Sequence, residues 1–439
     1  MRDRGYHARV PAATAAGAFR RRQNRPARTP GLQSGARELS ATFPPPDSPD
    51  RRRELLLTLL QTALQRVSGR ASTRAALAAL NQAYPHGTVW IAAVGKAACD
   101  MALGAHDALG AAVDRTLVIT RAGHSTPELL ARDRVELIES AHPVPDERSL
   151  AAGARLLQWV DELPATAAPL FLISGGASTL VEVLVDGASL EQLLQLNLQG
   201  LADGIAIGEL NARRRALSRI KGGGLAARLG GRAARALFIS DVPGNDPSVI
   251  GSGLLGAAPA GDHVQRAVVA SADDAVAAAA ATAQRRGFAV KVGAGRFDGP
   301  ATRLASRFAH ELRLDPAEVF VWGGESTVQL PPAPGRGGRN QHLALAAARL
   351  IAGERDLLLL AAGTDGTDGV TEDAGALVDA DTCARVALAG LDTDACLRQA
   401  DAGTALAASG DLVHTGPTGT NVGDLVIGLK MTAARSRAQ

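Results

Sequence analysis

Residues 168–178 read APLFLISGGAS, an unbroken apolar run that ends in a serine and two glycines. A run without polar alternation is typical of a strand that is buried on both faces of a sheet. Four more such runs also end in loops of Gly, Ser, Thr or acidic residues: 88–94, 235–240, 319–322 and 356–362. Because segments with helical periodicity separate them, these runs predict parallel sheets covered by helices on both faces.

The length of 439 residues is too great for one ordinary domain. We therefore predict an α/β fold made of two α/β domains with mainly parallel sheets. The expected boundaries are a basic tail at 1–53, an N-terminal domain at 54–290 and a C-terminal domain at 291–439, which begins near the strand-like segment FAVKV.

The composition excludes several classes of protein. Hydrophobic residues make up 46% of the chain, but no stretch of about 18 apolar residues occurs, so we expect no membrane partner. The three cysteines are far apart and form no zinc-binding spacing, which favours a reducing compartment, the cytoplasm. The segment 1–53 holds twelve arginines against four acidic residues, which gives it a net charge of +8. Because the whole chain has a net charge of +3, the net charge of residues 54–439 is −5, the difference between +3 and +8. We expect no nucleic-acid partner for that mildly acidic body.

The segment 1–53 has no periodic apolar face, as in RRRQNRPARTP and TFPPPDSPDRRR. This composition predicts disorder. The segment also lacks the apolar core of a secretory signal. An organelle transit peptide, a start codon placed too far upstream and a solvated extension all remain open.

The loops that follow the apolar runs predict a shared polar cleft. Glycine lets a backbone approach a ligand closely and exposes N–H groups to oxyanions, as in phosphate sites. Gly95-Lys96 is followed by alanine, so it does not complete a P-loop, and GAGRFDG (293–299) does not have the Rossmann spacing. The cleft is therefore expected to handle phosphate without either of these nucleotide motifs.

Lysine is rare in this chain, with four lysines among 47 basic residues. Two of them, Lys96 and Lys221, lie next to glycines. Lysine is a compact point charge, whereas arginine is a planar fork. Its retention at these positions indicates a need for an ammonium group, although a surface lysine is the alternative for each.

The segment GTDGTDGVTEDAGALVD (363–379) places Asp365, Asp368, Glu372 and Asp373 directly after a buried strand. Carboxylates repel one another unless a cation lies among them. Either the side chains point into water, as we expect for Glu372 and Asp373, or they help to hold a cation, for which Asp365 and Asp368 are the candidates. The segment HTGPTGTNVGDL (414–425) adds threonines and an asparagine suited to a ligand. His142 and His414 are expected to be structural, with proton transfer as the alternative.

Several motifs together resemble the class II glycerate kinases, which combine a glycerate kinase N-terminal domain with a C-terminal MOFRL domain. They occur in the expected order from about residue 54 to 430: VGKAACDMA, HPVPDERS, LISGGAS, LNARRRALSRIKGGGLA, ISDVPGNDPSVIGSG, GGEST, GGRNQHLAL, AAGTDGTDGVTEDAGALVD and HTGPTGTNVGDL. The resemblance implies a Rossmann-like N-terminal domain and an active-site cleft between two α/β domains.

The resemblance also implies a reaction, in which the γ-phosphoryl group of ATP passes to D-glycerate, giving mainly 2-phosphoglycerate, with Mg²⁺. The family's catalytic lysine and arginine correspond to Lys96 and Arg339, and we add Asp241 as a base. The metal is assigned to Asp365 and Asp368. Substrate or nucleotide binding is assigned to Ser174, Gly175, Gly176, Ser178, Lys221, Asp246, Glu325, Asn340, Gln341, Thr364, Thr418 and Asn421.

Two alternatives to a kinase remain at this point. One is an NAD(P)H-dependent hydroxypyruvate reductase, which the missing dinucleotide motif disfavours. The other is a regulator that binds sugar phosphates without catalysis. The expected partners are small molecules, D-glycerate and ATP, and a homodimer is left open.

Overall fold

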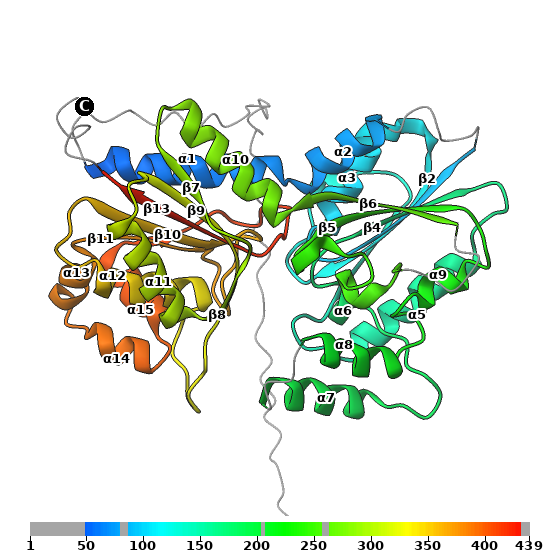
Figure 1. Cartoon of the computed structure of the whole chain (residues 1–439). Helices are drawn as coiled ribbons and strands as arrows, with labels where there is room; N and C mark the ends of the chain where they lie inside the picture. The colour runs from blue at the N-terminus through cyan, green and yellow to red at the C-terminus, as the bar shows by residue number, and fades with distance from the viewer. Residues whose placement is uncertain (1–48, 80–86, 203–206, 257–262, 432–439) are drawn as a thin grey trace, which may run out of the picture. The chain divides into compact units, whose positions relative to one another are not determined.

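The computed structural model describes residues 49–79, 87–202, 207–256 and 263–431 (Figure 1). Two sheets lie within one compact unit that spans residues 44–439. Each sheet has helices on both faces, so the prediction of two α/β domains is confirmed.

The first sheet has six strands in the order β3-β2-β1-β4-β5-β6, and every neighbouring pair is parallel. Its strands are β1 (Val89–Val94), β2 (Val113–Arg121), β3 (Val135–Ser140), β4 (Ala168–Ile173), β5 (Ala234–Ser240) and β6 (Val264–Ser271). Side chains of β1 alternate between two cores, with Ile91 facing α3 and Ala92 facing α5. All of β1 is buried, as its unbroken apolar sequence predicts.

The helices that accompany the first sheet are α2 (Gly69–Ala79), α3 (Ala98–Leu109), α4 (Pro127–Leu130), α5 (Glu147–Asp161), α6 (Ala177–Leu180), α7 (Leu190–Ala202), α8 (Ile207–Ala216) and α9 (Gly224–Arg228). Short 3-10 turns cover Gly110–Ala112, Pro243–Asn245 and Ile250–Gly253. Asp146 caps α5 by accepting a hydrogen bond from the backbone N–H of Arg148, and Ser189 and Gln192 form a capping box at the start of α7.

The second sheet is mixed, which differs from the expected parallel arrangement. Its order is β12-β11-β10-β13-β9-β7, and only β7 and β8 pair with β9 in parallel. The strands are β7 (Val290–Val292), β8 (Phe297–Pro300), β9 (Val319–Thr327), β10 (Leu357–Gly363), β11 (Gly375–Asp379), β12 (Leu412–Val413) and β13 (Asp424–Lys430). Strand β13 enters between β9 and β10 and is antiparallel to both. Apolar runs of this kind report burial on both faces but not strand direction.

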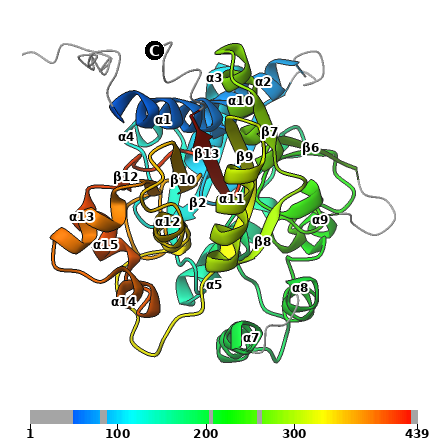
Figure 2. The same ribbon diagram turned by 60° about the vertical axis from the view of Figure 1, so that its left-hand side comes forward.

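Helices from distant parts of the chain cover the second sheet. One face carries α1 (Pro49–Arg66) and α10 (Ala272–Arg285), which pack together above β13 and β9 (Figures 1 and 2). The other face carries α11 (Ala301–Leu314) and α12 (Arg339–Leu350). Beside α12 lie the shorter helices α13 (Thr382–Leu388), α14 (Thr393–Arg398) and α15 (Ala402–Ser409) (Figure 2). The first helix of the described residues therefore packs on the sheet formed by their last strands.

The predicted disordered tail extends too far, because residues 49–53 belong to α1. Arg53 donates hydrogen bonds to Asp379 at 2.8 Å and to Asp411 at 3.0 Å. Those partners lie more than 300 positions away in the sequence, so local composition could not reveal them. Residues 1–48 lie outside the described residues. In the part of the chain that the structure describes, no helix is both long enough and apolar enough to span a membrane.

Candidate active site

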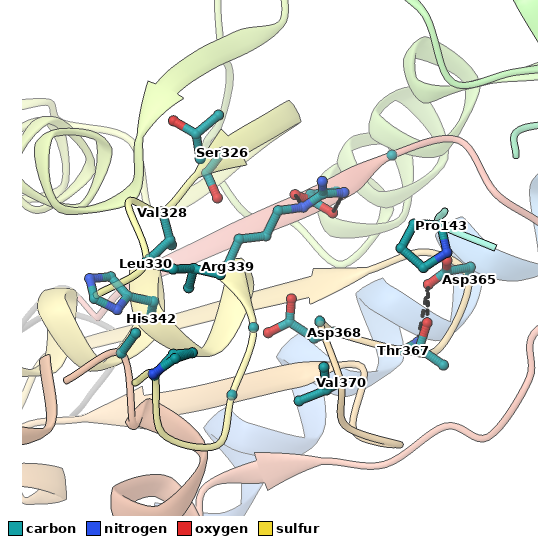
Figure 3. A pocket seen from close by; sticks show the side chains of 18 of the residues that line it. Pro143, Ser326, Val328, Leu330, Arg339, His342, Asp365, Thr367, Asp368 and Val370 are labelled. Atoms are coloured by element: carbon teal, nitrogen blue, oxygen red, sulfur yellow. Dashed lines mark hydrogen bonds and ion pairs between the residues drawn. The ribbon is translucent and has the colours of Figure 1, made fainter. Parts of the chain in front are cut away.

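A cavity of about 630 Å³ lies where the strand ends of both domains meet (Figure 3). Both domains contribute charged or polar side chains to its wall: Lys96, Arg121 and His142 from the first, and Arg339, Asp365, Asp368, Asn421 and Asp424 from the second. This position agrees with the general rule that ligands of α/β folds bind beyond the carboxyl ends of the strands.

Lys96 is held by the contact between two strand ends. Its backbone N–H donates to the carbonyl of Gly175 at 2.9 Å, and the N–H of Ala97 donates to Ser174 Oγ at 3.0 Å. Gly95 has φ +134°, and a Cβ there would come within 2.1 Å of Ser174 Oγ. The glycine and the serine therefore lock the loop after β1 onto the loop after β4. Ser174 supports Lys96 and is fully buried.

The Lys96 side chain joins the two domains. Its Nζ lies 2.6 Å from Oδ2 of Asp365, which follows β10. Burial would raise the pKa of Asp365, but Lys96 and the hydrogen bonds from Thr367 outweigh it and hold that pKa below its usual value. Asp365 is thus an ionised carboxylate inside the cavity.

Arg339 is the first residue of α12, and two carboxylates hold its guanidinium group. Asp424 contacts it through both oxygens, at 2.8 and 3.0 Å, and Glu325 accepts from Nη1. Burial would lower the pKa of Arg339, but Asp424 and Glu325 raise it above its usual value. The arginine therefore keeps its charge and a fixed orientation.

Asp368 binds the N-terminus of α12. Its two oxygens accept the backbone N–H groups of Asn340 at 3.0 Å and Gln341 at 2.8 Å. Burial raises the pKa of Asp368 to about 7, although these two N–H groups oppose the shift. The structure therefore gives this residue a capping role beside Arg339. Gln341 itself is fully buried and donates to Thr371 at 2.6 Å, so it does not line the cavity.

Asp241 follows β5 and approaches Gly175. A Cβ on Gly175 would meet Asp241 Oδ2 at 2.3 Å and Asn421 Nδ2 at 2.2 Å, so only glycine allows both side chains to converge there. Burial, followed by the charge of Glu325, raises the pKa of Asp241 to about 6. Such a carboxyl group can take up or release a proton near neutral pH.

Of the twelve residues predicted to bind substrate or nucleotide, Asn421 is the one that lines the cavity, and three others have partners elsewhere. Lys221 forms a buried ion pair with Glu182, whose other oxygen accepts from Ser218 at 2.5 Å. It is therefore neither a surface lysine nor a cavity residue. Asp246 is exposed and accepts two hydrogen bonds from Ser248 in a local turn. Ser178 hydrogen-bonds Ser252 at 2.7 Å in the neighbouring loop.

The threonines near the C-terminus mainly build the loops around the cavity. Thr364 Oγ1 donates to the carbonyl of Gly423 at 2.6 Å and accepts from the N–H of Val422 at 2.9 Å. Thr418 donates to the carbonyl of Thr364 at 2.5 Å. Of the hydroxyl and amide groups in 414–425, the amide of Asn421 is the one that lines the cavity.

The exposure of the acidic residues in 363–379 differs in part from the sequence-based expectation. Asp373 was expected in water, but it is 1% exposed and contacts Arg336 at 3.1 Å and His414 at 2.9 Å. The prediction was wrong because its partners come from other loops. Glu372 is exposed, as expected.

Four ionisable residues that line the cavity were not among the predicted site residues: Arg121, His142, His342 and Asp424. Arg121 is the last residue of β2, so the strand-end rule applied to the other loops would have found it. His142 Nδ1 is buried and has no hydrogen-bond partner in the described chain. Burial and the charges of Lys96 and Arg121 lower the pKa of His142 to about 3, so the ring is neutral and is no general acid at pH 7.

The cavity offers few ligands for a metal. Among the described residues, no group of three or more His, Cys, Asp or Glu side chains could hold an ion. Mg²⁺ in phosphoryl-transfer sites commonly uses one or two carboxylates together with phosphate and water oxygens. Asp365 is the better candidate because its pKa is lowered and it is ionised, although its oxygens also contact Lys96 and Thr367. Both oxygens of Asp368 accept N–H groups of α12, and burial raises its pKa.

The fold and the site define an α/β enzyme of two domains with a polar cavity between them. A family model described as a domain of unknown function, DUF4147, matches residues 55–284, and the MOFRL family matches 318–424. A D-glycerate 2-kinase of Thermotoga maritima is 34% identical over 87% of this chain and 99% of its own length. A glycerate 2-kinase of Pyrococcus horikoshii is 32% identical over 80% of this chain and 89% of its own.

A crystal structure of glycerate kinase from Thermotoga maritima has a TM-score of 0.76 and 32% identity, and it covers 87% of this chain and 100% of the other. The chain therefore belongs to the class II glycerate kinases, and it is an enzyme of the kinase class.

Proposed function

We propose that this enzyme transfers the γ-phosphoryl group of ATP to a hydroxyl group of D-glycerate and releases 2-phosphoglycerate. The observation that carries the proposal is the convergence of Lys96, Asp365 and Arg339 on one cavity built from both domains. Phosphoryl transfer depends on positioning and on positive charge at the moving group. The names and coverage of the relatives support the choice of glycerate.

The residues divide the work as follows. Lys96 and Arg339 neutralise the charge that develops on the transferring group, and Asp424 keeps Arg339 in place. Asp241 accepts the proton of the attacking hydroxyl, for which a pKa of about 6 is suitable. Asp365 would hold Mg²⁺, which, when bound, offsets the charge of the ATP phosphates.

The cavity has an apolar end that suits a nucleobase. Val328 and Leu330 lie on one side of Arg339, whereas Asp365 and Pro143 lie on the other (Figure 3). We place the base of ATP at the apolar end and the acceptor at the Lys96 end, with Arg339 between them. In this orientation both positive charges lie along the path of the phosphoryl group.

The test is an assay of purified enzyme with ATP, Mg²⁺ and D-glycerate. Coupling to enolase alone detects 2-phosphoglycerate, and addition of a phosphoglycerate mutase would be required if 3-phosphoglycerate were the product. We expect signal with enolase alone. Absence of ATP-dependent product in both assays, together with NADH oxidation in the presence of hydroxypyruvate, would instead favour the reductase alternative.

A further inference from the structure

Arg121 lies on the cavity wall at the carboxyl end of β2. The strands on either side also end at the cavity, since Lys96 follows β1 and His142 follows β3. The positive charges of both Lys96 and Arg121 act on His142 and on His124. Arg121 therefore belongs to the Lys96 end of the cavity.

Arg121 differs from the other two cations of the cavity. Lys96 pairs with Asp365, and Arg339 pairs with Asp424. In residues 49–79, 87–202, 207–256 and 263–431, the guanidinium of Arg121 has no recorded hydrogen bond or ion pair. A half-buried arginine has lost part of its hydration, and an anionic ligand would restore those contacts.

Two anions could occupy this position, a phosphate of ATP or the carboxylate of the acceptor. The apolar end of the cavity, with Val328 and Leu330, lies across Arg339 from Asp365 (Figure 3). A nucleotide whose base lies at that end brings its phosphates to Arg339 before it reaches Arg121. The planar guanidinium fork also matches a planar carboxylate through two parallel hydrogen bonds.

We propose that Arg121 binds the carboxylate of the acceptor and makes the enzyme select hydroxy acids over neutral polyols. This inference rests on the proposed phosphorylation of D-glycerate and adds the residue that recognises the acid. With the carboxylate on Arg121, the hydroxyl groups of a three-carbon acid would lie at the Lys96 end of the cavity.

The test compares wild type, Arg121→Gln and Arg121→Lys with D-glycerate and with its neutral amide, glyceramide. We expect Arg121→Gln to lower kcat/KM for D-glycerate about 100-fold, through the loss of charge-assisted hydrogen bonds, and to leave KM for ATP within about twofold. Its preference for D-glycerate over glyceramide should fall by a similar factor. Arg121→Lys should recover only part of the loss, because lysine lacks the fork.

Arg115→Gln is the matched control, because Arg115 lies at the other end of β2 and pairs with Glu162 outside the cavity. It should leave both KM values unchanged. If the Arg121 variants do not fold, the wild-type enzyme is treated with phenylglyoxal, which modifies arginine, in the presence of each ligand. Mass spectrometry then measures how far Arg121 has been modified. D-glycerate should protect this residue, and ATP alone should not.

Unchanged kinetics in a folded Arg121→Gln, a rise confined to KM for ATP, or protection by ATP alone would overturn the inference while leaving the proposed function in place. A wild-type enzyme that does not phosphorylate D-glycerate would contradict both the proposed function and the inference about Arg121. The two failures are therefore distinguishable.

Discussion

Lys96 and Asp365 form an ion pair of 2.6 Å that links the loop after β1 of the first domain to the loop after β10 of the second. Their side chains are 15% and 9% exposed. A pair this well shielded is a structural contact between the two domains, in addition to the catalytic role that we propose for Lys96.

Replacement of Lys96 by Met should destabilise the protein by about 3 kcal/mol at pH 8, because it leaves the Asp365 carboxylate buried without a cation. The double variant Lys96→Met/Asp365→Asn should recover most of this loss but no activity. Urea titrations provide the measurement. Arg228→Met, which breaks an exposed pair with Asp161, is the control and should cost less than about 1 kcal/mol.

The contribution of the Lys96–Asp365 pair to folding stability should change with pH in a predictable direction. In the wild type the pKa of Asp365 is lower in the folded than in the unfolded chain, where it is 3.8. The pair therefore stabilises the fold at pH values above 3.8, and this stabilisation is lost as the pH falls below 3.8. In Lys96→Met, burial is opposed only by the hydrogen bonds from Thr367, so we expect the pKa of Asp365 to rise. The variant should then lose stability as pH rises. Thermal melts in which Lys96→Met is destabilised equally at pH 5 and pH 8 would argue against a buried pair.

Asp241→Asn should lower kcat by about 10²–10⁴-fold, because the hydroxyl proton loses its acceptor. In the wild type, kcat/KM should fall as pH drops through about 6, where Asp241 becomes protonated. The raised pKa also means that ionised Asp241 opposes folding above that pH, so the asparagine variant should be at least as stable at pH 8. Asp161→Asn on the surface is the control. An Asp241→Asn enzyme with normal turnover would exclude the assigned base.

Asp365 and Asp368 should respond differently to Mg²⁺. Asp365→Asn should raise the Mg²⁺ concentration needed for half-maximal rate, because Asp365 is an ionised carboxylate on the cavity wall. Asp368→Asn should leave that concentration nearly unchanged and cost about 1 kcal/mol in stability, since it caps α12. Magnesium titrations of both variants provide the comparison. A larger shift for Asp368→Asn would reverse the assignment.

Two truncated forms test the boundary of α1. A chain that begins at residue 49 should melt like the full-length protein and turn over at the same kcat, as the composition of 1–48 predicts. A chain that begins at residue 54 lacks Arg53 and its contacts with Asp379 and Asp411, so its melting temperature should be lower. Equal melting temperatures would mean that Arg385, which also binds Asp411, suffices there.

The sequence predicted the buried strands well because an unbroken apolar run is visible locally. It did not predict that β13 is antiparallel to both of its neighbours or that α1 covers the second sheet, since both depend on contacts between distant segments. Within the site, strand-end loops led to Lys96 and Asp365, which both line the cavity. Asp424 could not be found by looking at the loops after strands, because it is the first residue of its strand. Antiparallel pairing places it opposite Gly363, at the edge of the cavity.

The same limit explains the misplaced polar residues. Thr364 and Lys221 have side chains suited to a ligand, yet their partners are a backbone carbonyl and a buried glutamate supplied by other segments. A sequence shows which groups need partners. Only the fold shows whether those partners are protein atoms or a substrate.

The central claim is that the cavity formed by Lys96 and Arg339 transfers phosphate to D-glycerate. Its most direct test is kcat/KM for D-glycerate of Lys96→Met, measured with ATP and Mg²⁺ under conditions where circular dichroism shows the variant folded. We predict a fall of at least about 100-fold, because a charge on the transferring group is lost. A folded variant that keeps more than about a tenth of the wild-type value, a loss below roughly 1.4 kcal/mol, would contradict the account.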